Sequence, residues 1–174
     1  MISNFFFQIA NLKNIPRTGW KTKLHISNPE SVADHSYMMT VMSMVLSDLK
    51  NMKTDKILKM SLIHDWAESK IGDFMPDEIT HERKTELEEY AMIEILEGLP
   101  VKLKEDYYNL WDEYKENSSI EAKFVHELDK LEMALQAKIY EKESDPEKIK
   151  PFIVSAVEQI GDEDLKKILI DIIQ

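Results

Sequence analysis

The chain has 174 residues, of which 33 are acidic, 22 are basic and none is cysteine, so its formal net charge is −11 at pH 7. The absence of cysteine excludes disulfides, thiolate metal sites and a cysteine nucleophile, and it favours a cytoplasmic protein. The acidic charge disfavours a nucleic acid polymer as partner. No apolar run is long enough to span a bilayer, so a membrane is not expected as a partner either.

The length suits one domain, and residues 1–174 are predicted to form it. The first residues have an apolar patch without a basic segment or a cleavage site, so a signal peptide is not expected. Four glycines and apolar residues at helical spacing predict an all-α fold. The predicted helices span residues 3–13, 29–49, 54–69, 81–97, 101–116, 119–143, 147–160 and 163–173. Stretches 14–28 and 70–80 are predicted to be irregular, and such segments often carry binding residues.

Local signals indicate where three of these helices begin. Asn28 and Asp145 each precede a proline and are predicted N-caps, because proline fits the first helical position. Ser118 and Glu121 have the spacing of a capping box, in which each side chain accepts a hydrogen bond from the other residue's backbone.

One histidine interrupts an apolar helix face. His35 lies on the face of the predicted helix 29–49 that also carries Met39, Met42 and Leu46. A histidine in such a position is more often a hydrogen-bonded core residue than a metal ligand. His35 alone therefore leaves both interpretations open.

Two titratable residues, His64 and Asp65, directly follow an apolar helical run. A buried carboxylate is costly unless it is paired, hydrogen-bonded or bound to a metal. A hydrogen bond near a helix end would satisfy Asp65, and so would a metal bound to both residues. Because adjacent side chains of a helix diverge, the pair alone is weak evidence for a metal.

A second acid, Asp129, interrupts an apolar face of the predicted helix 119–143 and presents the same solvation problem. One divalent cation held by His35, His64, Asp65 and Asp129 would give all four buried polar groups a partner. Two imidazoles and two carboxylates suit cobalt, manganese or another first-row ion, with magnesium as an alternative. Such a ligand set leaves positions open for water and substrate.

Four blocks of sequence surround these residues. They are PRTGW at 16–20, ESVADHS at 30–36, HDWAESKIGD at 64–73 and ELDKLEMALQA at 127–137. In their order, His35, the His64-Asp65 pair and Asp129 resemble the H…HD…D signature of the HD-domain metal-dependent phosphohydrolases. The four blocks together resemble the HD-domain 5'-deoxynucleotidases over most of the chain. One departure is Asp34, which stands where many relatives have glutamate.

The resemblance implies that a homodimer with one divalent metal ion hydrolyses deoxyribonucleoside 5'-monophosphates to nucleoside and phosphate. Glu68 falls one helical turn after His64, on the same face, where it would hold and deprotonate the attacking water. Without a metal site, the simpler interpretation of Glu68 is a solvated acid at a helix end.

Three further residues have roles implied by the resemblance. Arg17 would bind the phosphate, because its guanidinium suits bidentate phosphate recognition, although most arginines are simply surface residues. Trp20 would crowd the ribose 2'-hydroxyl and select deoxyribose; otherwise it is a packing anchor. Asp73, assigned to both the catalytic and the substrate-binding set, would accept a hydrogen bond from the 3'-hydroxyl; otherwise it caps a turn.

The remaining histidines and one acidic run are given no role in the site. His25, His81 and His126 are predicted not to be ligands, and the acidic run 82–89 is predicted to be a solvated helix face.

Several alternative functions remain. The first is another HD phosphohydrolase, which would act on a cyclic nucleotide, a nucleoside triphosphate or an alarmone. The second is a non-catalytic module that would keep the metal and sense a nucleotide. The third is a structural adaptor, which would not need buried acids. Glu68 and Arg17 beside a complete ligand set favour the enzyme.

Overall fold

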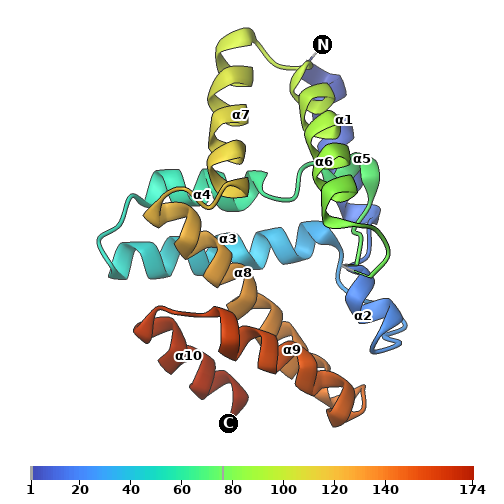
Figure 1. The fold of residues 1–174 in the computed structure, drawn as a ribbon, viewed down its shortest axis with the longest axis vertical. Helices are drawn as coiled ribbons and strands as arrows, with labels where there is room; N and C mark the ends of the chain where they lie inside the picture. The colour runs from blue at the N-terminus through green and yellow to red at the C-terminus, as the bar shows by residue number, and fades with distance from the viewer. Residues whose placement is uncertain (1, 76) are drawn as a thin grey trace.

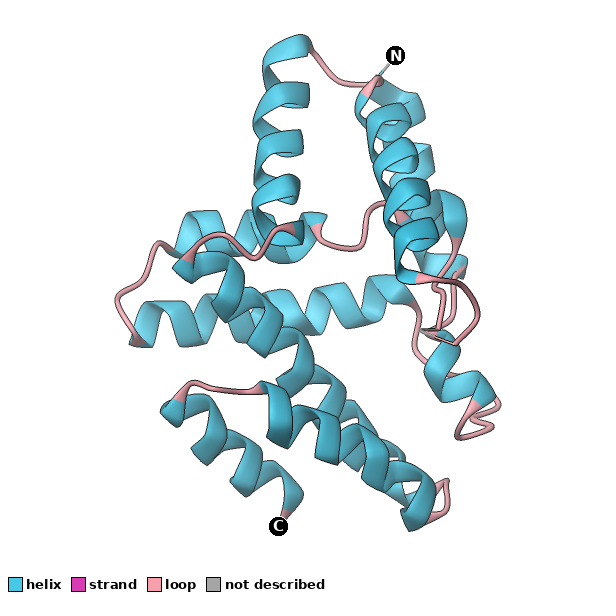
Figure 2. Cartoon of the chain, in the orientation of Figure 1, coloured by secondary structure: helices cyan, strands magenta, loops and turns pink. Residues whose placement is uncertain are grey.

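The computed structural model describes residues 2–75 and 77–174; residue 1 of the predicted domain and residue 76 of the predicted irregular stretch lie outside them. The all-α prediction is confirmed, because the described residues form helices and one isolated bridge between Pro16 and Ser31 but no strand. Short loops join most of the helices (Figure 2). The elements, with η for 3₁₀ helices, are α1 (Ile2–Ala10), η1 (Asn11–Asn14), α2 (Thr18–Thr22), α3 (Val32–Leu49), α4 (Thr54–Ile63), α5 (Glu68–Ile71), α6 (His81–Leu96), α7 (Val101–Lys115), α8 (Ile120–Ile139), η2 (Tyr140–Lys142), α9 (Pro146–Gln159) and α10 (Glu163–Ile173).

The antiparallel helices α3 and α4 form the centre of the molecule, and α8 packs against both (Figure 1). Helices α9 and α10 in turn pack on α8. The apolar core between these five helices includes Met39, Ile57, Leu128, Leu131 and Leu165, none of which is exposed. Burial of apolar surface contributes about 25 cal/mol per Å². This core therefore fixes α3, α4 and α8 relative to one another.

Two smaller apolar clusters attach the outer elements. Ile63, Met92 and Trp111 join the end of α4 to α6 and α7, which stand above the central pair in Figure 1. Trp20 and Ile149 belong to a second cluster, which attaches α2 to α8 and α9. The clusters bring α2 and α6 to the same side of the central helices as the end of α4.

Helix α3 begins three residues later than predicted. Asn28 is not its N-cap; Ser31 is, and it forms a capping box with Asp34, from Asp34 N to Ser31 Oγ (3.1 Å) and from Ser31 N to Asp34 Oδ2 (2.9 Å). The aspartate that departs from the family pattern thus caps its own helix. The extended residues before α3 hold the N-terminal loop, because Arg17 N donates to Glu30 O at 2.9 Å.

The other two predicted helix starts differ in outcome. For α8 the N-cap is Ser119, whose Oγ accepts a hydrogen bond from Ala122 N at 3.1 Å, and the predicted Ser118 is wrong by one residue. For α9 the predicted Asp145 is confirmed, since its Oδ1 accepts a hydrogen bond from Glu147 N at 3.0 Å.

The predicted helix 54–69 is broken in the structure. Helix α4 ends at Ile63 and α5 begins at Glu68, with turns between them. Within this break Glu68 N donates to Asp65 O at 3.1 Å, a three-residue spacing that is tighter than the four-residue spacing of an α-helix. His64 still has α-helical geometry, with its N–H bonded to Met60 O at 3.0 Å, and Asp65 follows it in the turns. The two residues therefore lie at the end of α4 and not within a continuous helix.

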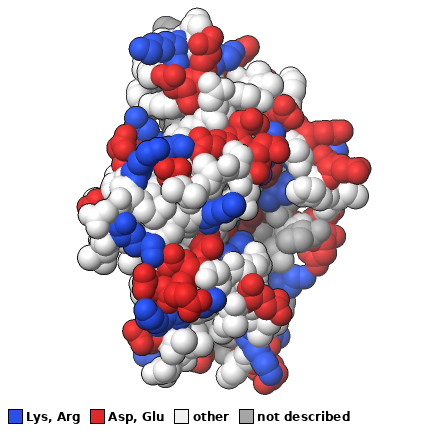
Figure 3. All heavy atoms as spheres, turned by 60° about the vertical axis from the view of Figure 1, so that its left-hand side comes forward, with Lys and Arg blue, Asp and Glu red and all other residues white. Residues whose placement is uncertain are grey.

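The surface carries both signs of charge. Acidic and basic side chains are interspersed with uncharged ones over the face in Figure 3. Within the part of the chain that the structure describes, no helix has the length and apolar character needed to cross a membrane.

Candidate active site

The structure brings the four predicted ligands together. Helix α3 supplies His35, the break after α4 supplies His64 and Asp65, and α8 supplies Asp129. His35 Nε2 lies 3.3 Å from Asp129 Oδ1 and 3.8 Å from Asp65 Oδ2, and His64 Nε2 lies 3.0 Å from that same Asp65 oxygen. Donor atoms that bind one ion at about 2.1 Å lie roughly 3.0–3.4 Å apart. Two of the three separations lie in this range, and the separation between His35 and Asp65 is longer. The donor atoms of His35, His64 and Asp129 all lie within 4.8 Å of one another, so these three residues are close enough to share one small cation, with Asp65 beside them.

Three atoms of this cluster are buried and have no hydrogen-bond partner among the described residues. They are His35 Nε2, His64 Nε2 and Asp65 Oδ2. Buried polar atoms without partners are rare in folded proteins and call for an explanation such as a bound ion. All three are atoms that bind first-row metals, so the residues present fit a divalent cation.

The opposite ring nitrogens of both histidines are hydrogen-bonded. His64 Nδ1 lies 2.7 Å from the carbonyl oxygen of Ser61, which can only accept, so Nδ1 carries the proton. His35 Nδ1 lies 2.6 Å from Glu132 Oε2, a carboxylate oxygen that accepts a hydrogen bond. These bonds leave both Nε2 atoms directed at the cluster and available as ligands.

The electrostatics of the cluster favour a positive charge within it. Burial and Arg17 lower the pKa of His35, but the nearby carboxylates of Asp129 and Glu132 outweigh them and raise it to about 10. Burial raises the pKa of Asp129, but Lys130 and His35 hold it well below its usual range. A metal ion held by these residues would supply the same positive charge in place of the proton on His35 Nε2.

Glu68 lies beside the cluster at the start of α5. Its side chain is buried, and Oε2 has no hydrogen-bond partner among the described residues. Burial, followed by repulsion from Asp65 and Asp73, raises the pKa of Glu68 well above its usual range. A carboxyl group perturbed in this way in a cleft is a candidate acid or base.

Arg17 and Asp73 lie near each other beside the cluster. Arg17 Nη1 lies 3.6 Å from Asp65 Oδ2 and 3.9 Å from Asp73 Oδ1. Two hydrogen bonds from Thr18 hold Asp73, one from Thr18 N to Asp73 Oδ2 and one from Thr18 Oγ1 to the Asp73 carbonyl, both 2.6 Å long. Gly72, with φ of 83°, turns the chain between α5 and Asp73.

Trp20 is both a packing anchor and part of a cavity wall. It is 3% exposed, and its Nε1–H donates to Glu30 Oε1 at 2.7 Å. Its ring centroid lies 5.6 Å from that of Tyr140 and 4.5 Å from that of Phe152. The sequence left open whether Trp20 is a packing residue or a wall against the sugar, and its position is compatible with both roles.

A cavity of about 920 Å³ opens over the cluster, and every predicted site residue except His35 lines it. This volume is in the range of small-molecule sites. Five lysines also line it, namely Lys23, Lys84, Lys115, Lys130 and Lys148. They supply local positive charge for an anionic ligand in a chain that is acidic as a whole.

Comparison with known proteins identifies the fold and the family. The profile of the HD domain family matches residues 9–168. The chain belongs to the HD domain family. The 5'-deoxynucleotidase HDDC2 of Homo sapiens is 46% identical over 138 residues, which cover 79% of this chain and 67% of the relative.

Solved structures confirm the HD-domain fold. The PH0347 protein from Pyrococcus horikoshii OT3 is 30% identical with a TM-score of 0.79, over 98% of this chain and 97% of that protein. A predicted metal-dependent phosphohydrolase from Magnetospirillum magnetotacticum MS-1 is 25% identical with a TM-score of 0.74, over 98% of this chain and 88% of that protein.

The other histidines of this HD domain lie outside the cluster. His126 Nε2 donates to the carbonyl oxygen of Tyr114 at 2.9 Å, and the two rings stack with centroids 4.0 Å apart. His81 is exposed at the start of α6, and His25 is exposed in the loop after α2, with φ of 58°. His126 therefore uses Nε2 for its hydrogen bond, whereas His35 and His64 use Nδ1 and leave Nε2 free.

The HD domain also has site residues that sequence analysis missed. Lys84 and Glu88 of α6 line the cavity, with Lys84 Nζ 3.5 Å from Glu88 Oε1, so the prediction that 82–89 is a solvated face is wrong for these two. Burial lowers the pKa of Lys84, but Glu88 and then Glu68 outweigh it and raise the pKa. Their four-residue spacing showed that they share a face, but not which way α6 turns that face.

Proposed function

We propose that this HD domain is a 5'-deoxynucleotidase, which hydrolyses deoxyribonucleoside 5'-monophosphates to deoxyribonucleoside and phosphate. The observation that carries the proposal is the convergence of the unpartnered atoms of His35, His64 and Asp65 beside Asp129, next to a cavity of nucleotide size. The name of the 46% identical relative supports this choice among the reactions of HD domains.

The metal site of the proposal consists of His35, His64, Asp65 and Asp129, which would hold one divalent ion. A bound ion polarises a phosphate oxygen and neutralises developing negative charge. Nitrogen and oxygen ligands in this mixture suit cobalt, manganese or another first-row ion, with magnesium as an alternative.

Glu68 is the proposed general base. Its carboxylate orients a water molecule and takes a proton from it as the water oxygen attacks phosphorus. The bond between phosphorus and the 5'-oxygen breaks, that oxygen takes a proton from solvent water, and Glu68 returns its proton to the solvent. The role is supported by the position of Glu68, which lines the cavity and whose buried Oε2 has no hydrogen-bond partner among the described residues.

Substrate selection is assigned to the loop before and through α2. Arg17, already held near Asp65 and Asp73, would bind the phosphate oxygens of the substrate. Asp73 belongs to both the catalytic and the binding set, and its Oδ1 would accept a hydrogen bond from the 3'-hydroxyl. Trp20 would close the space that a 2'-hydroxyl needs, because its packing leaves the ring no room to move.

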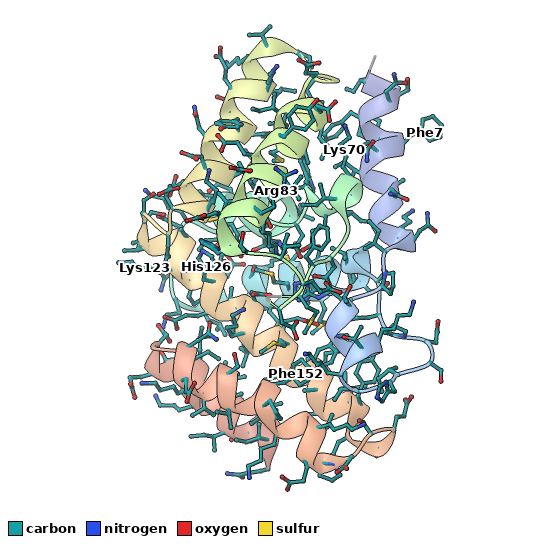
Figure 4. The ribbon with its side chains drawn as sticks, turned by 45° about the vertical axis from the view of Figure 1, so that its right-hand side comes forward. Phe7, Lys70, Arg83, Lys123, His126 and Phe152 are labelled. Atoms are coloured by element: carbon teal, nitrogen blue, oxygen red, sulfur yellow. The ribbon has the colours of Figure 1, made fainter. Side chains whose placement is uncertain are left out.

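The proposal also covers the domain boundaries, the oligomeric state and the location of the enzyme. The family match over 9–168 supports one domain over residues 1–174. We propose a homodimer, for which the exposed aromatic side chains Phe6 and Phe7 of α1 offer apolar contact area; Phe7 points away from the rest of the chain (Figure 4). The absence of cysteine from the sequence supports a cytoplasmic location.

The experiment that tests the function is a phosphate-release assay. It compares matched deoxyribo- and ribonucleoside 5'-mono-, di- and triphosphates, each with Co²⁺, Mn²⁺ and Mg²⁺. Cyclic nucleotides, whose hydrolysis gives a nucleoside monophosphate and no free phosphate, are followed in parallel by chromatography of the products. The proposal expects the highest kcat/KM with deoxyribonucleoside 5'-monophosphates. A preference for ribonucleotides, or turnover confined to triphosphates or cyclic nucleotides, would overturn the substrate assignment and leave the metal site in place.

A further inference from the structure

We infer that Glu132 is a positioning residue of the metal site, which holds His35 so that its Nε2 points at the ion. The inference rests on the metal ligands proposed above. Glu132 Oε2 accepts a hydrogen bond from His35 Nδ1 at 2.6 Å, and the two side chains are 1% and 0% exposed. A buried, charge-assisted bond of this length fixes both the tautomer and the ring orientation of the histidine.

The geometry of α8 explains why Glu132 reaches this histidine. Glu132 lies three residues after Asp129, so both side chains project from one face of the helix toward α3. Asp129 Oδ1 lies 3.3 Å from His35 Nε2, while Glu132 bonds the opposite nitrogen of the same ring. One helix turn thus supplies a proposed ligand and the group that orients a ligand from another helix.

Glu132 acts through His35 and not on the substrate, because it does not line the cavity. A second ion held by Glu30, His35 and Glu132 is geometrically conceivable, since their donor atoms lie within 4.8 Å of one another. However, Glu30 Oε1 already accepts a hydrogen bond from Trp20 Nε1, and Glu132 Oε2 accepts one from His35 Nδ1. The unpartnered nitrogen of His35 is Nε2, so this group is a hydrogen-bonded support for the first site.

The test measures the dissociation constant of Co²⁺ by calorimetry, together with the melting temperature of metal-depleted protein. It compares the parent with Glu132→Ala and Glu132→Gln, of which the second keeps the shape and one acceptor oxygen but loses the charge. The matched control is Glu121→Gln, since Glu121 is also a buried glutamate of α8 but pairs with Lys56 outside the cavity. Loss of such a support typically weakens metal binding by about 10–100-fold.

The expected result is a Co²⁺ dissociation constant raised by about 10–100-fold in Glu132→Ala, raised less in Glu132→Gln and unchanged in Glu121→Gln. An unchanged constant in both Glu132 variants, with a lower melting temperature without metal, would show that Glu132 only stabilises a buried histidine and would overturn the inference. Failure of the metal site itself looks different, because the parent and His35→Ala would then bind Co²⁺ equally weakly.

Discussion

Two histidines of this chain, His64 and His126, each donate one hydrogen bond to a backbone carbonyl, but from opposite ring nitrogens. His64 uses Nδ1 toward Ser61 and so leaves Nε2 free, 3.0 Å from Asp65 Oδ2. His126 uses Nε2 toward Tyr114. The tautomer set by a single carbonyl therefore separates a candidate ligand from a structural histidine.

This difference predicts the effects of two matched substitutions. His64→Ala is expected to abolish metal binding and phosphate release, because it removes one of four donors to the ion. His126→Ala is expected to retain both, with some loss of stability from the stacked pair with Tyr114. Metal content by mass spectrometry and phosphate release measure the two effects. Full metal occupancy in purified His64→Ala would refute the ligand assignment.

Glu68 is predicted to matter for turnover and not for metal binding. Glu68→Gln is expected to bind Co²⁺ like the parent and to lower kcat by about 10²–10⁴-fold, the usual contribution of a general base. Glu94→Gln is the control, because Glu94 pairs with Lys70 outside the cavity. Steady-state kinetics at saturating substrate provide the measurement, and a kcat within a few-fold of the parent would remove Glu68 from the mechanism.

The burial of Trp20 decides how its role in selection has to be tested. Trp20→Ala would leave a cavity that costs about 3–5 kcal/mol, so Trp20→Phe is the better probe. We expect it to lower the ratio of kcat/KM for deoxyribo- over ribonucleoside monophosphates. Tyr140→Phe is the control, because it removes the bond between Tyr140 Oη and Glu30 N but leaves the cavity wall intact. Equal ratios in the parent and Trp20→Phe would mean that Trp20 is only a packing residue.

At the scale of elements, the break between α4 and α5 places the proposed ligands His64 and Asp65 at the end of a helix and not within one. The sequence predicted a continuous helix here, because its apolar spacing runs through Ile63 and Glu68 one turn after His64 continues the pattern. The spacing of apolar residues does not show where backbone hydrogen bonds change from four-residue to three-residue spacing. That change depends on tertiary packing around the turn. The four predicted ligands nevertheless converge, because each was identified as a polar group on an apolar face.

Residues outside such faces could not be predicted. Lys84 and Glu88 enter the cavity because α6 packs on α5 and α7, and their polar neighbours in sequence gave no sign of it. Glu132 lay within a recognised block, but its partner His35 is 97 residues away. The relevant information in both cases is the contact between distant elements, which one sequence does not contain.

The turn after α5 gives a prediction at the same scale. Gly72 has φ of 83° and ψ of 171°, a region that residues with a Cβ almost never occupy. Gly72→Ala is expected to cost about 1–3 kcal/mol in unfolding free energy, and it should lower kcat/KM further by displacing Asp73. Gly161→Ala is the control, at a glycine without positive φ. Denaturant unfolding and kinetics measure both effects; parental values for Gly72→Ala would contradict the assigned role of this turn.

At the scale of the whole molecule, an acidic chain concentrates six acids beside one cavity. The residues that line it include Asp65, Glu68, Asp73, Glu88, Asp129 and Glu147, and the chain carries a net charge of −11. Removing the positive partner of a buried charge is strongly destabilising. If a metal binds only the folded state, its binding free energy therefore adds to the free energy of unfolding.

Metal binding is accordingly predicted to raise thermal stability. Free Co²⁺ at about 100 times its dissociation constant adds about 2.7 kcal/mol to the free energy of unfolding. For a chain of this size that corresponds to an increase in Tm of roughly 5–10 °C over metal-depleted protein. Differential scanning calorimetry measures it, with His64→Ala as the control that should show no increase. An equal increase in both proteins would point to binding elsewhere.

The measurement that tests the central claim most directly is phosphate release from a deoxyribonucleoside 5'-monophosphate by metal-depleted protein during titration with Co²⁺, with bound metal determined on the same samples. The account predicts no release at the start, and a rate that rises in proportion to occupancy until the site is full. Release at the full rate without metal, or no release at full occupancy, would contradict it.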